Sequence, residues 1–213
     1  MGKFRFHLAV SADGYVAGPD QSEENPLGVG GEELHDWITE LEAWRKAHGK
    51  EGGEVNASTP VVEELQANVG ASVMGRNMFG PIRGDWGDES WRGWWGEDPP
   101  FHYPVFVLTH HPREPLEMEG GTTFNFVTGG IEAALERATE AADAKDVLLN
   151  GGASVAQQAL AAGLIDEFEL HVVPMILGDG ERLLDNVGDL RLEQVRAVDA
   201  PGVTHIKYRV HKS

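Results

Sequence analysis

Glycines and arginines at the ends of predicted strands are the residues of this sequence best suited to bind a ligand. The apolar run Val147-Leu148-Leu149 stops at Asn150-Gly151-Gly152, and a helical pattern resumes from Ser154. A strand that enters a helix through a glycine turn presents free backbone N–H groups and a partial positive charge, which suit a phosphate. The alternative is that the glycine pair only makes a tight turn.

Two further predicted strands end in basic or hydroxyl-bearing residues. Val73-Met74 leads into Gly75-Arg76, and the strand at 105–109 leads into Thr109-His110-His111-Pro112-Arg113. Guanidinium groups are natural partners of phosphate oxygens because they donate two parallel hydrogen bonds. The carboxyl ends of parallel strands meet at one edge of a sheet, where ligands bind. Two basic strand ends and one glycine-rich helix start therefore suit a dinucleotide that carries an extra phosphate.

Two carboxylates are candidates for catalysis. Asp13 follows the first predicted strand within Ser11-Ala12-Asp13-Gly14, where it could orient a substrate amine or relay a proton. Asp-Gly is also an ordinary turn pair. Asp36 lies with Glu32 and Glu33 at the start of a predicted helix, where acids also stabilise the helix dipole. For both aspartates the functional and the structural role stay open.

The composition excludes several classes of protein. The 213 residues include 17 basic and 35 acidic side chains, a net charge of −18, which disfavours nucleic acids and anionic membranes as partners. Cysteine is absent, and the nine histidines lack metal-binding spacing, so we expect no metal site. No apolar stretch approaches the roughly 20 residues of a membrane span. No cleavable leader is recognisable, so we expect a cytoplasmic protein.

The elements that must position these residues alternate between strands and helices before ending in strands alone. This order predicts one α/β domain over residues 1–213, with a mostly parallel sheet, an antiparallel C-terminal edge and flanking helices. Strands are expected at 4–10, 71–74, 105–109, 124–127, 147–149, 168–177, 190–198 and 204–211. Helices are expected at 32–48, 59–68, 130–144 and 154–162, the last with Gly163 as its C-cap.

An irregular stretch at 80–103 carries four tryptophans, at positions 86, 91, 94 and 95. They could pack in a core, form a contact between subunits or stack on a planar substrate. A glycine-rich loop is a poor place to bury four indoles. We therefore favour an interface or a pocket wall.

The motifs, taken in order, resemble a known family. Val73-Met74-Gly75-Arg76, Val107-Leu108-Thr109 and 149–154 follow the order and approximate spacing of the dihydrofolate reductase fold. Residues 11–17 resemble the first-strand motif of the C-terminal reductase domain of the bifunctional riboflavin-biosynthesis deaminase/reductase. The chain is similar to stand-alone members of that superfamily over residues 4–210. The deaminase half is absent, and Tyr15 replaces a basic residue that is common in the riboflavin-pathway motif.

The resemblance implies a dihydrofolate-reductase-like fold with NADPH as the hydride donor. By position, Gly75, Arg76 and Asn77 would line the cofactor groove. The adenosine end and its 2′-phosphate would face Thr109, His110 and Arg113. The pyrophosphate would lie at the helix N-terminus formed by Gly151, Gly152, Ala153, Ser154 and Val155.

The resemblance also implies an activity and a partner. The activity would be hydride transfer to a C=N or C=O bond of a small heterocycle. The reaction would be similar to that of 5-amino-6-(5-phosphoribosylamino)uracil reductase, with Asp13 or Asp36 in catalysis. Alternatives are a true dihydrofolate reductase and an inactive nucleotide-binding protein. Stand-alone relatives are typically homodimers, and we expect a two-fold contact through the tryptophan-rich loop and the strand at 168–177.

Overall fold

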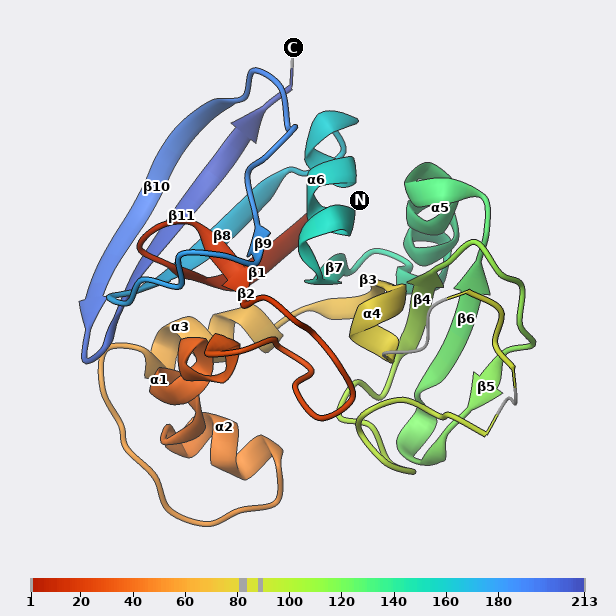
Figure 1. Ribbon diagram of the computed structural model, residues 1–213, viewed down its shortest axis with the longest axis horizontal. Helices are drawn as coiled ribbons and strands as arrows, with labels where there is room; N and C mark the ends of the chain where they lie inside the picture. The colour runs from red at the N-terminus through yellow and green to blue at the C-terminus, as the bar shows by residue number, and fades with distance from the viewer. Residues whose placement is uncertain (1, 81–83, 88–89, 213) are drawn as a thin grey trace. The chain divides into compact units, whose positions relative to one another are not determined.

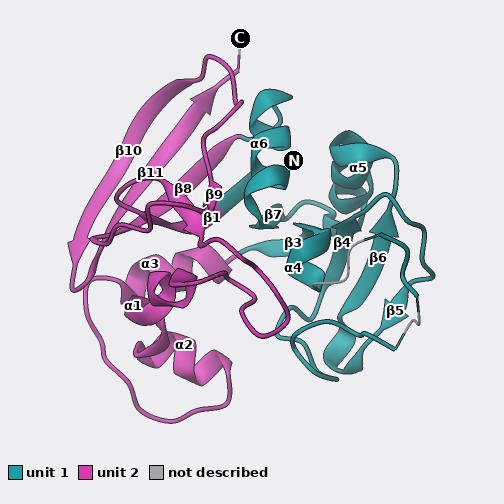
Figure 2. Ribbon diagram, viewed as in Figure 1, with its two compact units in different colours: residues 1–6, 68–165 teal, residues 7–67, 166–213 magenta. Residues whose placement is uncertain are grey.

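The computed structural model describes residues 2–80, 84–87 and 90–212 (Figure 1). The chain is divided into two compact units, and each is built from two separate stretches of sequence (Figure 2). The first unit contains residues 1–6 and 68–165, and the second contains residues 7–67 and 166–213. Strand β1 (Phe4–Ser11) begins in the first unit and ends in the second.

A mostly parallel sheet forms the centre of the first unit. Strand β7 (Asp146–Gly151) pairs parallel with β1 and with β3 (Val69–Gly75), β3 pairs parallel with β4 (Pro104–Leu108), and β4 pairs parallel with β6 (Thr123–Val127). Among the described strands of this unit, β5 (Leu116–Glu117) is the one that runs antiparallel to its neighbour, β6. The parallel strands are buried along most of their length, as expected where both faces are covered. The order of strands is β1, β7, β3, β4, β6 and β5.

Helices follow several strands of this unit, and those at 130–142 and 153–161 lie where the sequence predicts them. Helix α4 (Arg76–Phe79) comes directly after β3, and α6 (Ala153–Ala161) after β7. Helix α5 (Gly130–Ala142) buries one isoleucine and three alanines at spacings of three and four residues, which is the apolar stripe of an amphipathic helix. Gly163, with φ 66°, is the left-handed residue that ends α6. A short 3₁₀ turn, η2 (Glu119–Gly121), completes the unit.

Trp86 is buried in the core of the first unit, so our preference for an interface or pocket wall is wrong for this residue. Its side chain is 6 % exposed and lies edge-on to Phe79 and Phe126. Trp91 and Trp95 pack against the same cluster. The loop can bury these indoles because backbone carbonyls accept their N–H groups: Trp86 donates to His111 and Trp91 to Phe79. Residues 81–83 and 88–89 of this stretch lie outside the described residues.

The second unit contains antiparallel strands and short helices. Strand β11 (Val203–His211) pairs antiparallel with β10 (Arg191–Ala200) on one side and with β8 (Glu167–Val173) on the other. A separate two-stranded sheet joins β2 (Tyr15–Ala17) to β9 (Glu181–Arg182). The helical segments are η1 (Gly31–His35), α1 (Asp36–Thr39), α2 (Glu42–Ala47) and α3 (Thr59–Gln66).

Two predicted elements are shorter in the structure. The helix expected at 32–48 is broken into η1, α1 and α2 because Leu41 is extended and pairs with Glu54. Glu42 N–H donates to the Glu54 carbonyl, which replaces a helical hydrogen bond. The strand expected at 168–177 ends at Val173, since Pro174 has no N–H for the ladder. The α/β class, with a mostly parallel sheet, flanking helices and an antiparallel C-terminal edge, is confirmed.

Among the described residues, no helix has both the length and the apolar character needed to cross a membrane.

Candidate functional site

The predicted glycine positions of the first unit lie side by side at the carboxyl ends of β3 and β7. The two strands are parallel, and Met74 is opposite Gly151. A Cβ atom on Gly75 would lie 2.9 Å from Val155 Cγ2 and 3.6 Å from the Gly152 nitrogen. Only glycine therefore lets the end of β3 approach the first turn of α6 so closely.

The start of α6 is open on the side of Gly152. A Cβ atom at Gly152 would meet no atom within 4 Å. Gly151, with φ 123°, is the residue of the pair that needs a left-handed backbone, whereas Gly152 is extended; the peptide bond between them is cis. No side chain caps the helix. Its first-turn N–H groups therefore border a space that a phosphate could fill.

Within the first turn of α6, the side chains are divided between packing and the surface. Ala153 and Val155 are buried and hold the helix against the sheet. Ser154 is exposed, and its hydroxyl accepts a hydrogen bond from Gln158 at 3.2 Å. Ser154 is thus the one hydroxyl at this helix start, at the position that the sequence assigns to a pyrophosphate.

Arg76 is the first residue of α4 and its guanidinium group is only partly satisfied. Nη1 donates to Thr109 Oγ1 at 3.1 Å, and Cζ lies 3.2 Å from the centre of the Trp86 ring. Nε and Nη2 are buried and have no hydrogen-bond partner among the described residues. Burial, and then the charge of Arg113, lower the pKa of Arg76, although a guanidinium stays charged at neutral pH. Two unused donors on a retained cation suit an anion.

Arg113 lies on the same indole as Arg76. Its Cζ is 4.9 Å from the Trp86 ring centre, and its Nη2 donates to the Trp91 carbonyl at 2.8 Å. The residue is 8 % exposed. Trp86 thus holds both guanidinium groups through its π face, a role that sequence reasoning missed. The density of tryptophan in this stretch marked the region, but nothing in the spacing singled out Trp86.

Thr109, His110 and Asn77 complete the predicted cofactor set. Thr109 is buried and its hydroxyl accepts hydrogen bonds from both Arg76 and the His111 N–H, so it orients the guanidinium while closing the turn after β4. His110 and Asn77 are exposed. All of the predicted cofactor residues therefore lie in the first unit, at the ends of β3, β4 and β7.

Asp13 lies in the second unit and is held by hydrogen bonds in the turn after β1. Oδ1 accepts from Ser11 Oγ at 2.6 Å and from Leu177 N at 3.1 Å, and Oδ2 accepts from Gly178 N at 2.8 Å. The Ser11 hydroxyl and these backbone N–H groups lower the pKa of Asp13. The side chain is therefore a fixed carboxylate, suited to orienting a cationic or N–H-bearing group.

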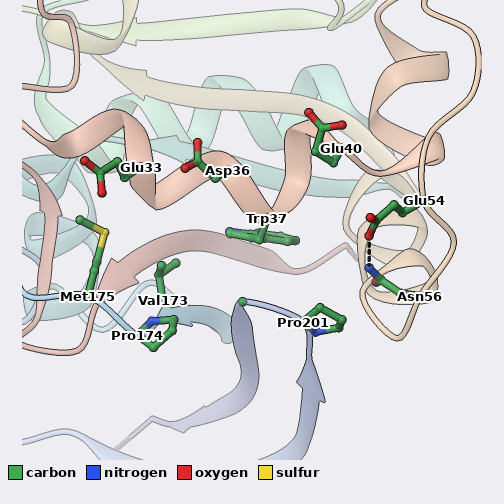
Figure 3. Close-up of a pocket in the computed structure, with 11 residues that line it drawn as sticks. Glu33, Asp36, Trp37, Glu40, Glu54, Asn56, Val173, Pro174, Met175 and Pro201 are labelled. Atoms are coloured by element: carbon green, nitrogen blue, oxygen red, sulfur yellow. Dashed lines mark hydrogen bonds between the residues drawn. The ribbon is translucent and has the colours of Figure 1, made fainter.

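Asp36, at the start of α1, lines a pocket of about 400 Å³ within the second unit (Figure 3). Three further acids, Glu33, Glu40 and Glu54, line the same pocket, and none of the described lysines, arginines or histidines does. Trp37 points toward the side formed by Val173 and Pro201 (Figure 3). A planar, amine-bearing molecule would find both charge and apolar surface here.

A mostly parallel sheet with an antiparallel edge and flanking helices places the chain in the dihydrofolate-reductase-like fold class. The chain belongs to the RibD C-terminal domain family, whose model matches residues 3–205.

Solved structures of low sequence identity share the fold. A putative riboflavin biosynthesis protein from Shewanella sp. PV-4 is 19 % identical, with a TM-score of 0.61, and the match covers 98 % of this chain and 99 % of that one. Dihydrofolate reductase from Enterococcus faecalis, complexed with NADP(H), is 14 % identical, with a TM-score of 0.51, over 99 % of this chain and 97 % of that one.

One curated relative has a similar sequence over a shorter stretch. The uncharacterized protein YyaP of Bacillus subtilis (strain 168) is 37 % identical over 67 residues, which are 30 % of this chain. The chain spans only 35 % of the length of that relative in this match.

Proposed function

We propose that the protein is an NADPH-dependent reductase that transfers a hydride to a C=N or C=O bond of a small heterocyclic substrate. The observation that carries the proposal is the open start of α6, where a Cβ on Gly152 would meet no atom within 4 Å. Membership of the RibD C-terminal domain family supports a reductase of the riboflavin-pathway type. The Enterococcus faecalis enzyme with the same fold is a reductase complexed with NADP(H).

In this proposal the residues of the first unit hold the cofactor. The backbone of Gly151 and Gly152 and the first turn of α6 bind the pyrophosphate through N–H groups. Arg76 binds the 2′-phosphate with Nε and Nη2, its two donors without a partner among the described residues. When bound, NADPH supplies the hydride, and the protein supplies orientation and electrostatics.

The two aspartates of the second unit have different surroundings, and we propose different roles. Asp13 has a lowered pKa, so it stays ionised at neutral pH and orients a substrate N–H or amine rather than delivering its own proton. Asp36 is exposed on the pocket wall beside Trp37. The acidic wall favours a substrate that bears amino groups, as aminopyrimidines and pterins do.

The position of Asp36 also favours a second candidate function. Glu32, Glu33 and Asp36 lie at the helix start where the resemblance implies the pterin-binding acid of dihydrofolate reductases, and Asp36 lines a pocket large enough for a planar ring. A true dihydrofolate reductase therefore stays as the alternative. The two functions differ in substrate and share the cofactor.

Loss of NADPH absorbance across a panel of substrates tests the proposal. The panel contains dihydrofolate, a dihydropterin and 5-amino-6-(5-phosphoribosylamino)uracil. We expect turnover on the aminopyrimidine and little on dihydrofolate. The reverse order identifies the alternative. Tight NADPH binding without turnover on any member would favour a nucleotide-binding protein that has lost catalysis. Absence of NADPH binding contradicts the proposal itself.

A further inference from the structure

Three histidines from separate strands form a hydrogen-bonded chain inside the second unit. His171 Nδ1 on β8 lies 2.8 Å from His205 Nδ1 on β11. His171 Nε2 lies 3.3 Å from His7 Nδ1 on β1, and His205 Nε2 lies 2.9 Å from Ser58 Oγ, just before α3. His171 and His205 are 2 % and 0 % exposed. The chain thus joins three strands and the start of a helix.

The hydrogen bonds among the three histidines limit how many protons the rings can bind. A neutral imidazole has one N–H donor and one acceptor nitrogen. Three neutral rings can satisfy every contact, with the donors all pointing toward Ser58 or all toward His7. One added proton still leaves an acceptor at each contact. With two added protons, any placement sets two N–H groups against each other between neighbouring rings, so a contact is lost.

The surroundings also oppose protonation. Arg196 on β10 is the nearby cation, and it is bound to Glu169 on β8 and to Glu64 on α3. Desolvation, then the other histidines and Arg196, put the pKa of His171 well below its ordinary value. Desolvation and Arg196 lower the pKa of His205 to about 4.

A fourth histidine and an indole lie on the same cluster. His35, at the end of η1, has a pKa lowered by burial, although the Gly31 backbone and the neighbouring Asp36 act in the opposite direction. The Trp37 ring centre is 4.9 Å from that of His171 and 5.0 Å from that of His205. Trp37 also lines the pocket. One side chain therefore lies against both the histidine chain and the pocket.

In the part of the chain that the structure describes, no three histidine or acidic side chains are placed to hold a metal ion. His171 and His205 make their printed hydrogen bonds to each other, to His7 and to Ser58. We propose that His7, His171 and His205, closed by Ser58, form an acid-sensitive latch that holds Trp37 and the pocket wall in place while the rings are neutral and releases them when protons enter.

The direction of the pH effect follows from the lowered pKa values. A histidine whose folded pKa lies below its unfolded value of about 6.5 binds more protons when unfolded. Its contribution to stability is fully present above that pH and is lost as pH falls toward the folded pKa. A histidine that stays neutral in the folded state raises the unfolding constant about fivefold between pH 6.5 and 5.5, so His171 and His205 together should raise it about thirtyfold.

Urea unfolding of the full chain at several pH values between 7.5 and 5.5 tests the latch. We expect the unfolding constant of the wild type to rise about thirtyfold between pH 6.5 and 5.5. His171→Leu should be less stable than the wild type at pH 7.5. Its unfolding constant should rise at least about fivefold less than that of the wild type as the pH falls, because one proton-binding site is removed. His48→Gln is the matched control, since His48 is exposed. The unfolding constant of this variant should rise with falling pH as much as that of the wild type.

Histidine ¹⁵N NMR of the folded wild type decides the case if His171→Leu does not fold. We expect His171 and His205 to stay neutral, each in one tautomer, at pH 6. Hydrogen exchange at pH 5.5 should show that residues 31–41 and 203–211 lose protection, whereas α5 keeps its protection. Ordinary titration of His171 in the folded protein, or a pH-independent unfolding constant above pH 5.5, overturns the proposal.

Discussion

The guanidinium group of Arg76 is the side chain on which the proposed cofactor preference depends most. Its Nε and Nη2 lack hydrogen-bond partners among the described residues. Arg76→Gln should therefore weaken NADPH binding about ten- to a hundredfold, because one charge-assisted contact is worth roughly 1.5–3 kcal/mol. Binding of NADH, which has no 2′-phosphate, should change much less. Calorimetric titration with both cofactors measures the two effects.

A second arginine of the same unit gives the control for Arg76. Arg137 is an exposed residue of α5 whose guanidinium lies over the Phe106 ring. Arg137→Gln removes the same charge away from the proposed site, so both affinities should stay at wild-type values. Equal losses in the two variants would show a general effect of net charge and would remove Arg76 from the site.

Asp13 is the residue at which a catalytic role and a structural role compete. Its carboxylate holds the backbone of Leu177 and Gly178, and it stays ionised because these bonds and Ser11 lower its pKa. Asp13→Asn keeps the shape and removes the charge. We predict unchanged NADPH affinity and a fall in turnover of roughly 10²–10⁴-fold. Steady-state kinetics on the active substrate measures it.

Asp36→Asn is the comparison for Asp13→Asn. Asp36 is exposed and shares the pocket with three other acids, so its loss should reduce turnover much less. A larger effect at Asp36 than at Asp13 would indicate a dihydrofolate-reductase type of site. A loss of folding in Asp13→Asn, seen by circular dichroism, would show that the carboxylate serves the turn alone.

Among the helices and strands, the first turn of α6 is where one substitution tests the proposed phosphate site most directly. Gly152 is extended, and a Cβ there meets no atom within 4 Å, so a valine fits the fold. Gly152→Val should therefore leave circular dichroism unchanged and abolish NADPH binding, because the branched side chain fills the space of the phosphate. Calorimetry checks the binding. Wild-type affinity in the folded variant would mean that the turn is only structural.

The other end of α6 supplies the control. Ala162 follows the helix, is exposed and has helical backbone angles. Ala162→Val adds the same bulk as Gly152→Val, far along the helix from its start. Cofactor affinity should stay at the wild-type value. A comparable loss at Ala162 would point to a change in the helix rather than in a phosphate site.

Local sequence signals predicted the elements of the first unit well, because each depends on neighbouring residues. The glycine turn at 151–152 and the C-cap at Gly163 lie where turn chemistry put them. The break of the helix at 32–48 was not predictable, since Leu41 is extended to pair with Glu54, which is a tertiary contact. The histidine chain was also hidden, because His7 and His171 are 164 positions apart in sequence.

For the whole molecule, the family resemblance predicted the fold, which composition alone could not do. The candidate cofactor residues are brought together because parallel strands end at one edge. The functions of Trp86 and Trp37 were beyond the sequence, since an indole looks alike as core, platform or pocket wall. The substrate depends on side chains from several loops, for which sequence spacing gives no distances.

Association of two copies is a proposal at the scale of the whole molecule. The surfaces expected from the sequence are largely occupied, since β8 is buried and Trp86 is in the core. Strand β10 pairs only with β11 among the described strands, and its Leu192 and Val195 are 40 % and 45 % exposed. We propose that β10 forms a two-fold contact with a second copy.

Light scattering of wild type and Val195→Lys measures this association. The wild type should give about twice the chain mass of 23.2 kDa at micromolar concentration, and the variant should shift toward the single-chain mass. Glu181→Lys is the control, because it adds a lysine to an exposed position on β9, a strand of the separate two-stranded sheet, and it should leave the mass at the wild-type value. A wild-type particle of single-chain mass would contradict the proposal.

The central claim, a reductase site built for NADPH, depends on the open start of α6 and on the arginine beside it. Calorimetric titration of the wild-type protein with NADPH and with NADH, at low and at moderate salt, tests it most directly. We predict that NADPH binds about ten- to a hundredfold more tightly than NADH and that this preference narrows as salt screens the phosphate contact. Equal affinities for the two cofactors, or no binding of either, would contradict the account.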